Sequence, residues 1–191
     1  FSFYSGMEGG NALADILFGD VCPGGKLPYT VAYSEEDYPY FNPDCEEIEY
    51  EYYHGYCKME KEGRKVLYPF GYGLSYTEFS FGKPEAEVFA DTAKISISLK
   101  NTGSVKGAEV VQLYVGCRES KVDRPVKVLK DFARVELEPG KETKVSLSVS
   151  KRDMAYFDEE KDEFVTEDIK YVAYIGNCSA EAALQKIEFT F

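Results

Sequence analysis

The chain has 191 residues and a formal net charge of −12, from 34 acidic and 22 basic side chains. Its composition, 44% hydrophobic and 15% aromatic, argues against disorder over the whole length and fits one good core, or one core with part of another. The lysines form no basic block, so the negative charge argues against nucleic acid and against an anionic membrane surface as partners.

The first thirty residues predict one strand and one helix. The apolar and aromatic run Phe1–Tyr4 fits the end of a strand, and Gly19 stands where a left-handed cap would end the helix. The helix is expected from about 11 to 18, because four apolar residues there share one face: Ala12, Leu13, Ile16 and Leu17. One βα unit cannot cover both faces of a parallel sheet, so this segment needs a partner that supplies the remaining strands.

From Lys26 to about Thr77 the chain shows little sustained periodicity and predicts an extended connector. Eleven of the 16 tyrosines fall between Tyr29 and Tyr76. Leaving so much aromatic surface in water would cost about 25 cal/mol per Å² of apolar area. The connector is therefore expected to pack against other structure.

Beyond Phe79 the pattern changes to a period of two. Ile95, Ile97 and Leu99 alternate with polar residues before the turn-forming segment 101–103. Further strands are expected near 109–115, 128–137, 143–149, 163–166, 170–176 and 186–191. About seven strands separated by turn signals predict an immunoglobulin-like or fibronectin type III-like β-sandwich.

Five cysteines are odd in number and widely spaced: Cys22, Cys45, Cys57, Cys117 and Cys178. They lack the short CxxC pairs of a zinc site, and their pattern fits a reduced, cytoplasmic setting. No apolar run approaches the roughly 20 residues that span a bilayer.

Two segments carry a family resemblance: GMEGGNALADILFGDVCPGGKLPYTV over 6–31 and VLYPFGYGLSYTEFSF over 66–81. Together they resemble glycoside hydrolase family 3, the β-glucosidase family. The stretches AEVVQLYV over 108–115 and RPVKVLKDFARVELEPG over 124–140 also fit. The resemblance implies a mainly β chain in three parts. These are the carboxyl-terminal piece of an α/β sandwich domain over 1–30, an extended Tyr-rich linker over 31–78 and a fibronectin type III-like β-sandwich over 79–191.

The resemblance also implies where the chemistry lies. Family members of this kind use a catalytic aspartate in an amino-terminal barrel and an acid/base carboxylate earlier in the α/β sandwich. Both positions precede the segment that begins at Gly6. No catalytic residue is therefore assigned to this chain, its substrate-binding residues are unknown, and no metal or organic cofactor is implied.

Several residues that could carry chemistry have structural readings. Glu8 favours the positive end of the helix dipole, with a place near an active-site rim as the alternative. His54, the only histidine, has no nucleophile-elbow sequence beside it and cannot build a metal site alone, so we expect a hydrogen-bonded packing residue. The alternative for His54 is a contact to a sugar hydroxyl.

Two clusters are also expected to be structural. The acidic run Asp44, Glu46, Glu47, Glu49 and Glu51 lacks the offsets of a calcium loop and predicts a solvated face. An aromatic cluster near 67–79 is expected to pack against the neighbouring domain at the junction, although it resembles a sugar-stacking platform: Tyr68, Phe70, Tyr72 and Tyr76.

The resemblance implies a non-catalytic carboxyl-terminal portion or subunit of a retaining β-glucosidase that hydrolyses terminal β-linked glucosides. This chain would complete and clamp the α/β domain, be inactive alone, and require a second polypeptide that carries the barrel and the rest of that domain. The alternative is a stand-alone carbohydrate-binding or structural β-sandwich module.

Overall fold

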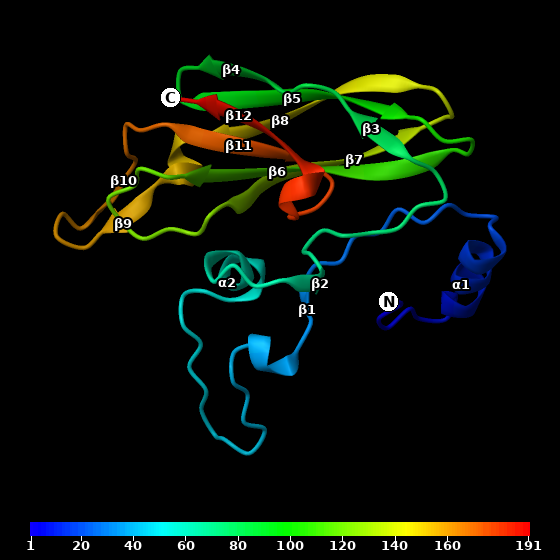
Figure 1. The fold of residues 1–191 in the computed structure, drawn as a ribbon, viewed down its shortest axis with the longest axis horizontal. Coiled ribbons are helices and arrows are strands. Elements are labelled where there is room, and N and C mark those ends of the chain that lie inside the picture. The colour runs from blue at the N-terminus through cyan, green and yellow to red at the C-terminus, as the bar shows by residue number, and fades with distance from the viewer.

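The computed structural model describes all of residues 1–191, and its main body is a β-sandwich of two antiparallel four-stranded sheets (Figure 1). One sheet has the order β12-β11-β6-β7, from Leu184–Phe189, Tyr171–Gly176, Gly107–Cys117 and Val128–Leu137. In the other sheet β5 (Thr92–Asn101) pairs with β8 (Glu142–Ser150) on one side and with β3 (Phe79–Phe81) and β4 (Glu85–Phe89) on the other. The predicted β-sandwich class is confirmed.

The core lies between the two sheets. Ile95, Ile97 and Leu99 of β5 are almost completely buried, and Ile97 lies opposite Val145 of β8. Their neighbours alternate outward, which is why the period of two predicted these strands correctly. Burying one such aliphatic side chain contributes about 1.5–3 kcal/mol, so this layer is the main source of stability.

The predicted strand at 163–166 exists but does not belong to the sandwich. β10 (Glu163–Val165) pairs with β9 (Tyr156–Asp158) in a separate two-stranded hairpin, in which Phe157 lies opposite Phe164. The sandwich reaches eight strands through β3 and β4, which the sequence did not predict. β4 is a short edge strand with four of its five residues exposed, so its hydrophobic pattern is weak.

The amino-terminal helix is confirmed, whereas the strand expected before it is wrong. α1 spans Gly9–Phe18 and ends at Gly19, whose φ of 87° is left-handed. Phe1–Tyr4 is irregular, because no strand of this chain lies beside it, and Phe1 and Phe3 instead contact the Tyr29 ring edge-on. No residue of α1 is buried, and three residues of its apolar face, Ala12, Leu13 and Leu17, are exposed.

The linker is less extended than expected. Two short strands in it, β1 (Val31–Ala32) and β2 (Val66–Tyr68), pair with each other. It also contains a 3-10 turn (Glu35–Asp37) and the helix α2 (Gly55–Lys61). α2 was missed because seven residues are too few to show a helical period. Outside the linker there are two further 3-10 turns, Lys151–Met154 and Glu181–Ala183.

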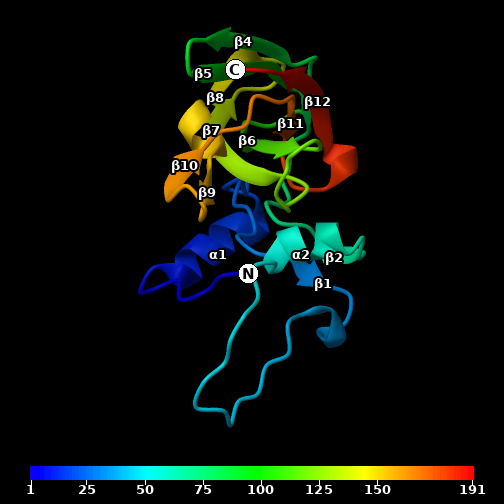
Figure 2. The same cartoon turned by 90° about the vertical axis from the view of Figure 1, so that its left-hand side faces the viewer.

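The linker packs on the outer face of the β12-β11-β6-β7 sheet, below the sandwich in both views (Figure 2). Tyr56 of α2 and Phe70 contact the ring of Tyr114, which is fully buried. β6 and β11 are therefore covered on both faces, and nearly all of their residues are buried. The expectation that the connector packs against other structure is confirmed for this part. No helix of the structure has the length and apolar character to cross a bilayer.

Candidate functional site

The two motifs that carry the family resemblance meet at the junction between linker and sandwich. The Leu27 N–H donates to the Tyr72 carbonyl at 2.8 Å, and the Gly71 N–H donates to the Leu27 carbonyl at 2.8 Å. The segments run so close together at Gly73 that a Cβ there would lie 2.2 Å from the Gly25 oxygen. A side chain cannot fit at Gly73. Residues 25–27 and 71–73, one segment from each motif, therefore run side by side, and we call this pair of segments the strap.

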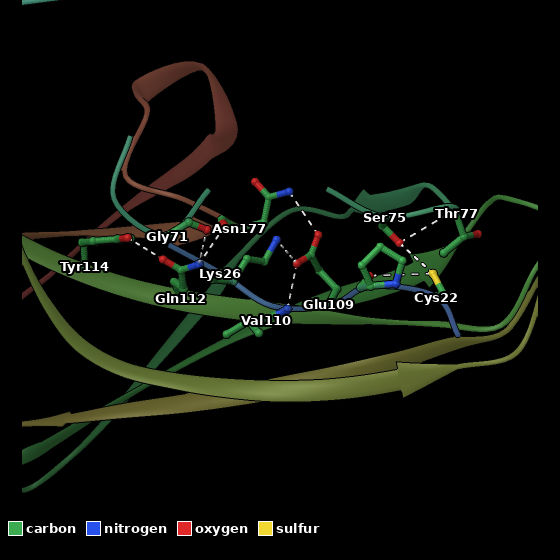
Figure 3. Close-up of polar contacts among 11 residues, drawn as sticks. Cys22, Lys26, Gly71, Ser75, Thr77, Glu109, Val110, Gln112, Tyr114 and Asn177 are labelled. Carbon is green, nitrogen blue, oxygen red and sulfur yellow. Dashed lines mark hydrogen bonds and ion pairs between the residues drawn. The ribbon is translucent and has the colours of Figure 1, made fainter. Parts of the chain in front are cut away.

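A buried ion pair fastens this strap to β6 (Figure 3). The Lys26 ammonium lies 2.5 Å from Glu109 Oε1, and the Asn177 amide donates to Glu109 Oε2 at 3.1 Å. Glu109 is only 5% exposed, yet both of its oxygens have partners. Because a buried carboxylate without partners would be strongly destabilising, Glu109 fixes where Lys26 and the strap lie.

Gln112, three residues further along β6, makes the second contact between the sheet and the strap (Figure 3). Its Nε2 donates to the Gly71 carbonyl at 3.1 Å and to the Asn177 carbonyl at 2.7 Å, while its Oε1 accepts from the Tyr114 hydroxyl at 2.5 Å. Gly71 has a φ of 78°, in the left-handed region that favours glycine. This buried network joins the strap, the sheet and the loop after β11.

A buried lysine between α2 and the β12-β11-β6-β7 sheet holds α2 in place. The Lys127 ammonium lies 2.5 Å from Glu60 Oε1 and faces the rings of Tyr114 and Tyr174, 5.9 and 5.7 Å from their centroids. Lys127 is 4% exposed. Burial raises the pKa of Glu60 above its usual value, although Lys127 acts in the opposite direction. The pair therefore specifies the position of α2 at a desolvation cost.

An open pocket of about 380 Å³ lies beside the strap. Its lining is small and mostly apolar: Lys26, Pro69, Tyr72, Gly73, Asn177, Cys178, Ala180, Ala182 and Ala183. Burial raises the pKa of the Cys178 thiol, so this cysteine lacks the thiolate character of a nucleophile. No group of three or more His, Cys, Asp or Glu side chains is arranged to hold a metal ion.

The structure separates the polar residues singled out in the sequence. Glu8 is the N-cap residue of α1, but its carboxylate accepts from the Asn11 amide at 2.7 Å and caps no backbone N–H. His54 makes a hydrogen bond as expected, with its Nδ1 3.2 Å from the Tyr52 carbonyl, but its side chain is exposed, so the expected packing is wrong. The reason is that α2 buries Met59 and packs the half-buried Tyr56 against Tyr114, which leaves the residue before the helix exposed.

The two predicted clusters have different outcomes. The acidic run from Asp44 to Glu51 is exposed, as expected for a solvated face. Of the junction aromatics, Phe70 packs on the sheet, whereas Tyr76 is half exposed and its hydroxyl donates to the Ile16 carbonyl at 2.6 Å. The cluster therefore serves packing at Phe70 and tethers α1 at Tyr76.

The fastening residues Lys26, Glu109 and Gln112 were missed in the sequence. One signal could have found two of them, because Glu109 and Gln112 are polar residues within AEVVQLYV, an otherwise apolar strand. Buried polar groups need hydrogen-bond partners, so polar residues there indicate a specific contact. Lys26 carries no such signal.

Comparison with known proteins places this junction in a family. Residues 1–76 match the glycosyl hydrolase family 3 C-terminal domain, and residues 109–179 match the fibronectin type III-like domain. A β-glucosidase of Kluyveromyces marxianus is 41% identical over an alignment of 185 positions, gaps included, that covers 93% of this chain and 22% of that protein. A β-glucosidase of Bacteroides ovatus is 39% identical over an alignment of 193 positions, gaps included, that covers 94% of this chain and 26% of that protein.

Solved structures agree with these matches. The Kluyveromyces marxianus β-glucosidase in complex with glucose superposes with a TM-score of 0.85 at 39% identity, over 98% of this chain and 23% of that one. β-Glucosidase 3B of Thermotoga neapolitana superposes with a TM-score of 0.87 at 32% identity, over 96% of this chain and 26% of that one. The chain thus spans about a quarter of the length of these relatives. It belongs to glycoside hydrolase family 3, in which it corresponds to the carboxyl-terminal portion, the end of the α/β sandwich domain and the fibronectin type III-like domain.

Proposed function

We propose that residues 1–191 are the non-catalytic carboxyl-terminal portion of a retaining β-glucosidase that hydrolyses terminal β-linked glucosides. The single observation that carries this proposal is the strap, in which the two family motifs are hydrogen-bonded to each other and fastened to β6 through Glu109 and Gln112. The similar proteins are named as β-glucosidases, which supports the proposed class of reaction.

The role of the chain is to hold the α/β domain in place. α1 carries apolar residues that are exposed here, with Leu17 68% and Phe18 85% exposed. Residues 19–24 join α1 to the strap, so a rigid strap restricts where α1 can contact the rest of its domain. A 1 Å misplacement can cost on the order of 100-fold in rate, which makes such support consequential without any contact to substrate.

The chemistry is proposed to lie in the part of the enzyme that carries the barrel. A retaining glycosidase uses two carboxyl groups about 5–5.5 Å apart, one as nucleophile and one as general acid and base. Neither is assigned to a residue of this chain. The barrel-bearing part is joined to residues 1–191 or associates with them as a second polypeptide.

A cytoplasmic location is part of the proposal. All five cysteines are unpaired, and a reducing compartment keeps thiols in that state. A secreted protein would be expected to pair some of them.

The test is an assay on p-nitrophenyl β-glucoside. The 191-residue chain alone is expected to show no turnover, and the holoenzyme, in which it is assembled with the barrel-bearing part, is expected to release glucose with retention at the anomeric carbon. A holoenzyme without β-glucosidase activity would refute the proposal and favour a stand-alone carbohydrate-binding or structural module, which binding of the isolated chain to β-glucans would then distinguish.

A further inference from the structure

One segment of the linker has a strand pattern without a strand. From 47 to 52 acidic and apolar residues alternate strictly, with Glu47, Glu49 and Glu51 in one row and Ile48, Tyr50 and Tyr52 in the other. Such a period of two is typical of a strand with one buried face. Residues 46–53 nevertheless make no backbone–backbone hydrogen bond and belong to no sheet.

The apolar row is exposed. Ile48, Tyr50 and Tyr52 are 37%, 52% and 70% exposed. The acidic row makes no ion pair with any side chain of residues 1–191. The apolar side chains, the carboxylates and the strand-pairing backbone groups of this segment are therefore available for contact with a partner.

The surrounding loop presents this segment outward from fixed ends. We call residues 38–54 the arm. At one end the Tyr38 hydroxyl accepts from the Ala32 N–H at 2.7 Å and donates to the Thr30 carbonyl at 3.1 Å. At the other end the Tyr53 hydroxyl donates to Asp123 at 2.8 Å. Between these ends the arm extends away from the sandwich in both views (Figures 1 and 2).

The position of the arm indicates what covers it. The arm and α1 lie on the same side of the β12-β11-β6-β7 sheet, the side away from the sandwich core (Figure 2). The apolar face of α1 is also uncovered there. The relatives carry about three quarters of their length outside the matched part, which is ample to cover both surfaces.

Charge argues against a second copy of this chain as the occupant. A copy would bring another net charge of −12 to a row of unpaired carboxylates, and like charges brought together are unfavourable. A surface with an apolar floor and basic side chains along its rim is complementary to the two rows. An exposed strand edge beside such a floor would also satisfy the backbone groups.

We propose that residues 47–52 are a docking strand that adds to a strand edge on the barrel-bearing part of the enzyme. Ile48, Tyr50 and Tyr52 pack on its apolar floor, and the three glutamates face its basic rim. This inference rests on the proposed function. It goes further by assigning the arm to a specific contact between the two parts.

The first test is hydrogen exchange of the backbone amides in the holoenzyme and in the isolated 191-residue chain. The amides of 47–52 are expected to exchange about tenfold or more slowly in the holoenzyme, because strand pairing protects them. Equally fast exchange in both would overturn the docking strand. Activity of that same holoenzyme on p-nitrophenyl β-glucoside reports separately on the proposed function, so either idea can fail alone.

The second test is the triple variant Ile48→Ser, Tyr50→Ser, Tyr52→Ser. Because these side chains are exposed, urea unfolding of the isolated variant is expected to match the wild type. In the holoenzyme the variant is expected to lose the exchange protection of 47–52. The matched control replaces three exposed apolar residues of the sandwich, Phe89→Ser, Val105→Ser and Phe132→Ser, and should keep that protection. Retained protection in the arm variant would contradict the proposal.

Discussion

Glu167→Ala is expected to lower the free energy of unfolding by about 3 kcal/mol, because it leaves the partly buried Arg124 without its counter-charge and two hydrogen-bond donors without their acceptor. Glu167 is 8% exposed and lies in the connection between β10 and β11. Its carboxylate accepts from the Lys121 N–H at 2.7 Å, from the Ser120 hydroxyl at 2.6 Å and from Arg124 at 3.3 Å. The variant therefore removes the carboxylate to which three residues of the β6–β7 loop donate hydrogen bonds.

Urea unfolding of the isolated chain measures this loss. The matched control is Glu188→Ala, which breaks a pair with Lys170 in which both side chains are 65% exposed, and it should change stability by no more than about 0.5 kcal/mol. Equal effects of the two variants would show that the Glu167 network contributes nothing beyond a surface ion pair.

The same network predicts a pH dependence. Burial raises the pKa of Glu167, but the Lys121 N–H, the Ser120 hydroxyl and Arg124 together outweigh burial, so the pKa lies below its usual value. A carboxyl with a lowered pKa in the folded state stabilises fully above its unfolded pKa, and this contribution is lost as the pH falls through the folded pKa. The difference in stability between wild type and Glu167→Ala should therefore shrink below about pH 4. A difference that stays constant down to pH 2 would contradict the ionised network.

Gly71→Ala is expected to release the strap from β6. A Cβ at Gly71 would lie 2.1 Å from Gln112 Oε1, and φ at this position is 78°. The strain of a left-handed alanine costs about 1–2 kcal/mol, and forcing Gln112 aside adds about 1–3 kcal/mol. Urea unfolding gives the sum of the two costs.

Gly140→Ala separates these contributions. Gly140 has a similar φ of 72°, but nothing lies within 4 Å of the added Cβ. It should therefore show the backbone strain alone, and the excess loss in Gly71→Ala measures the contact with Gln112. Equal losses in the two variants would mean that Gln112 moves away freely and does not fasten the strap.

The sequence predicted the long strands well because each has one face in the core and one in water. β5 and β8 alternate for this reason, and β7 was predicted with its exact ends at 128 and 137. Strands that form only because a neighbouring strand pairs with them were harder to predict from the sequence. β3 has only three residues and pairs with the end of β5, and Phe1–Tyr4 has an apolar sequence but no strand beside it in this chain.

The contacts at the junction between linker and sandwich could not be predicted from the sequence, for a different reason. Lys26 and Glu109 are far apart in sequence, and neither residue type alone indicates a partner, so their pairing emerges only when the strap crosses β6. The motifs predicted the family and the order of its parts. They did not show that the motifs touch each other through Leu27, Gly71 and Tyr72.

The most direct test of the central claim is the native mass of the protein as isolated, measured together with its polypeptide content. The account predicts a mass that no whole number of copies of the 21.6 kDa chain explains, because protein that carries the barrel is joined to residues 1–191 or associated with them. A monomer or homo-oligomer that contains only this chain would contradict it, because α1 and the arm would then have no catalytic part to contact.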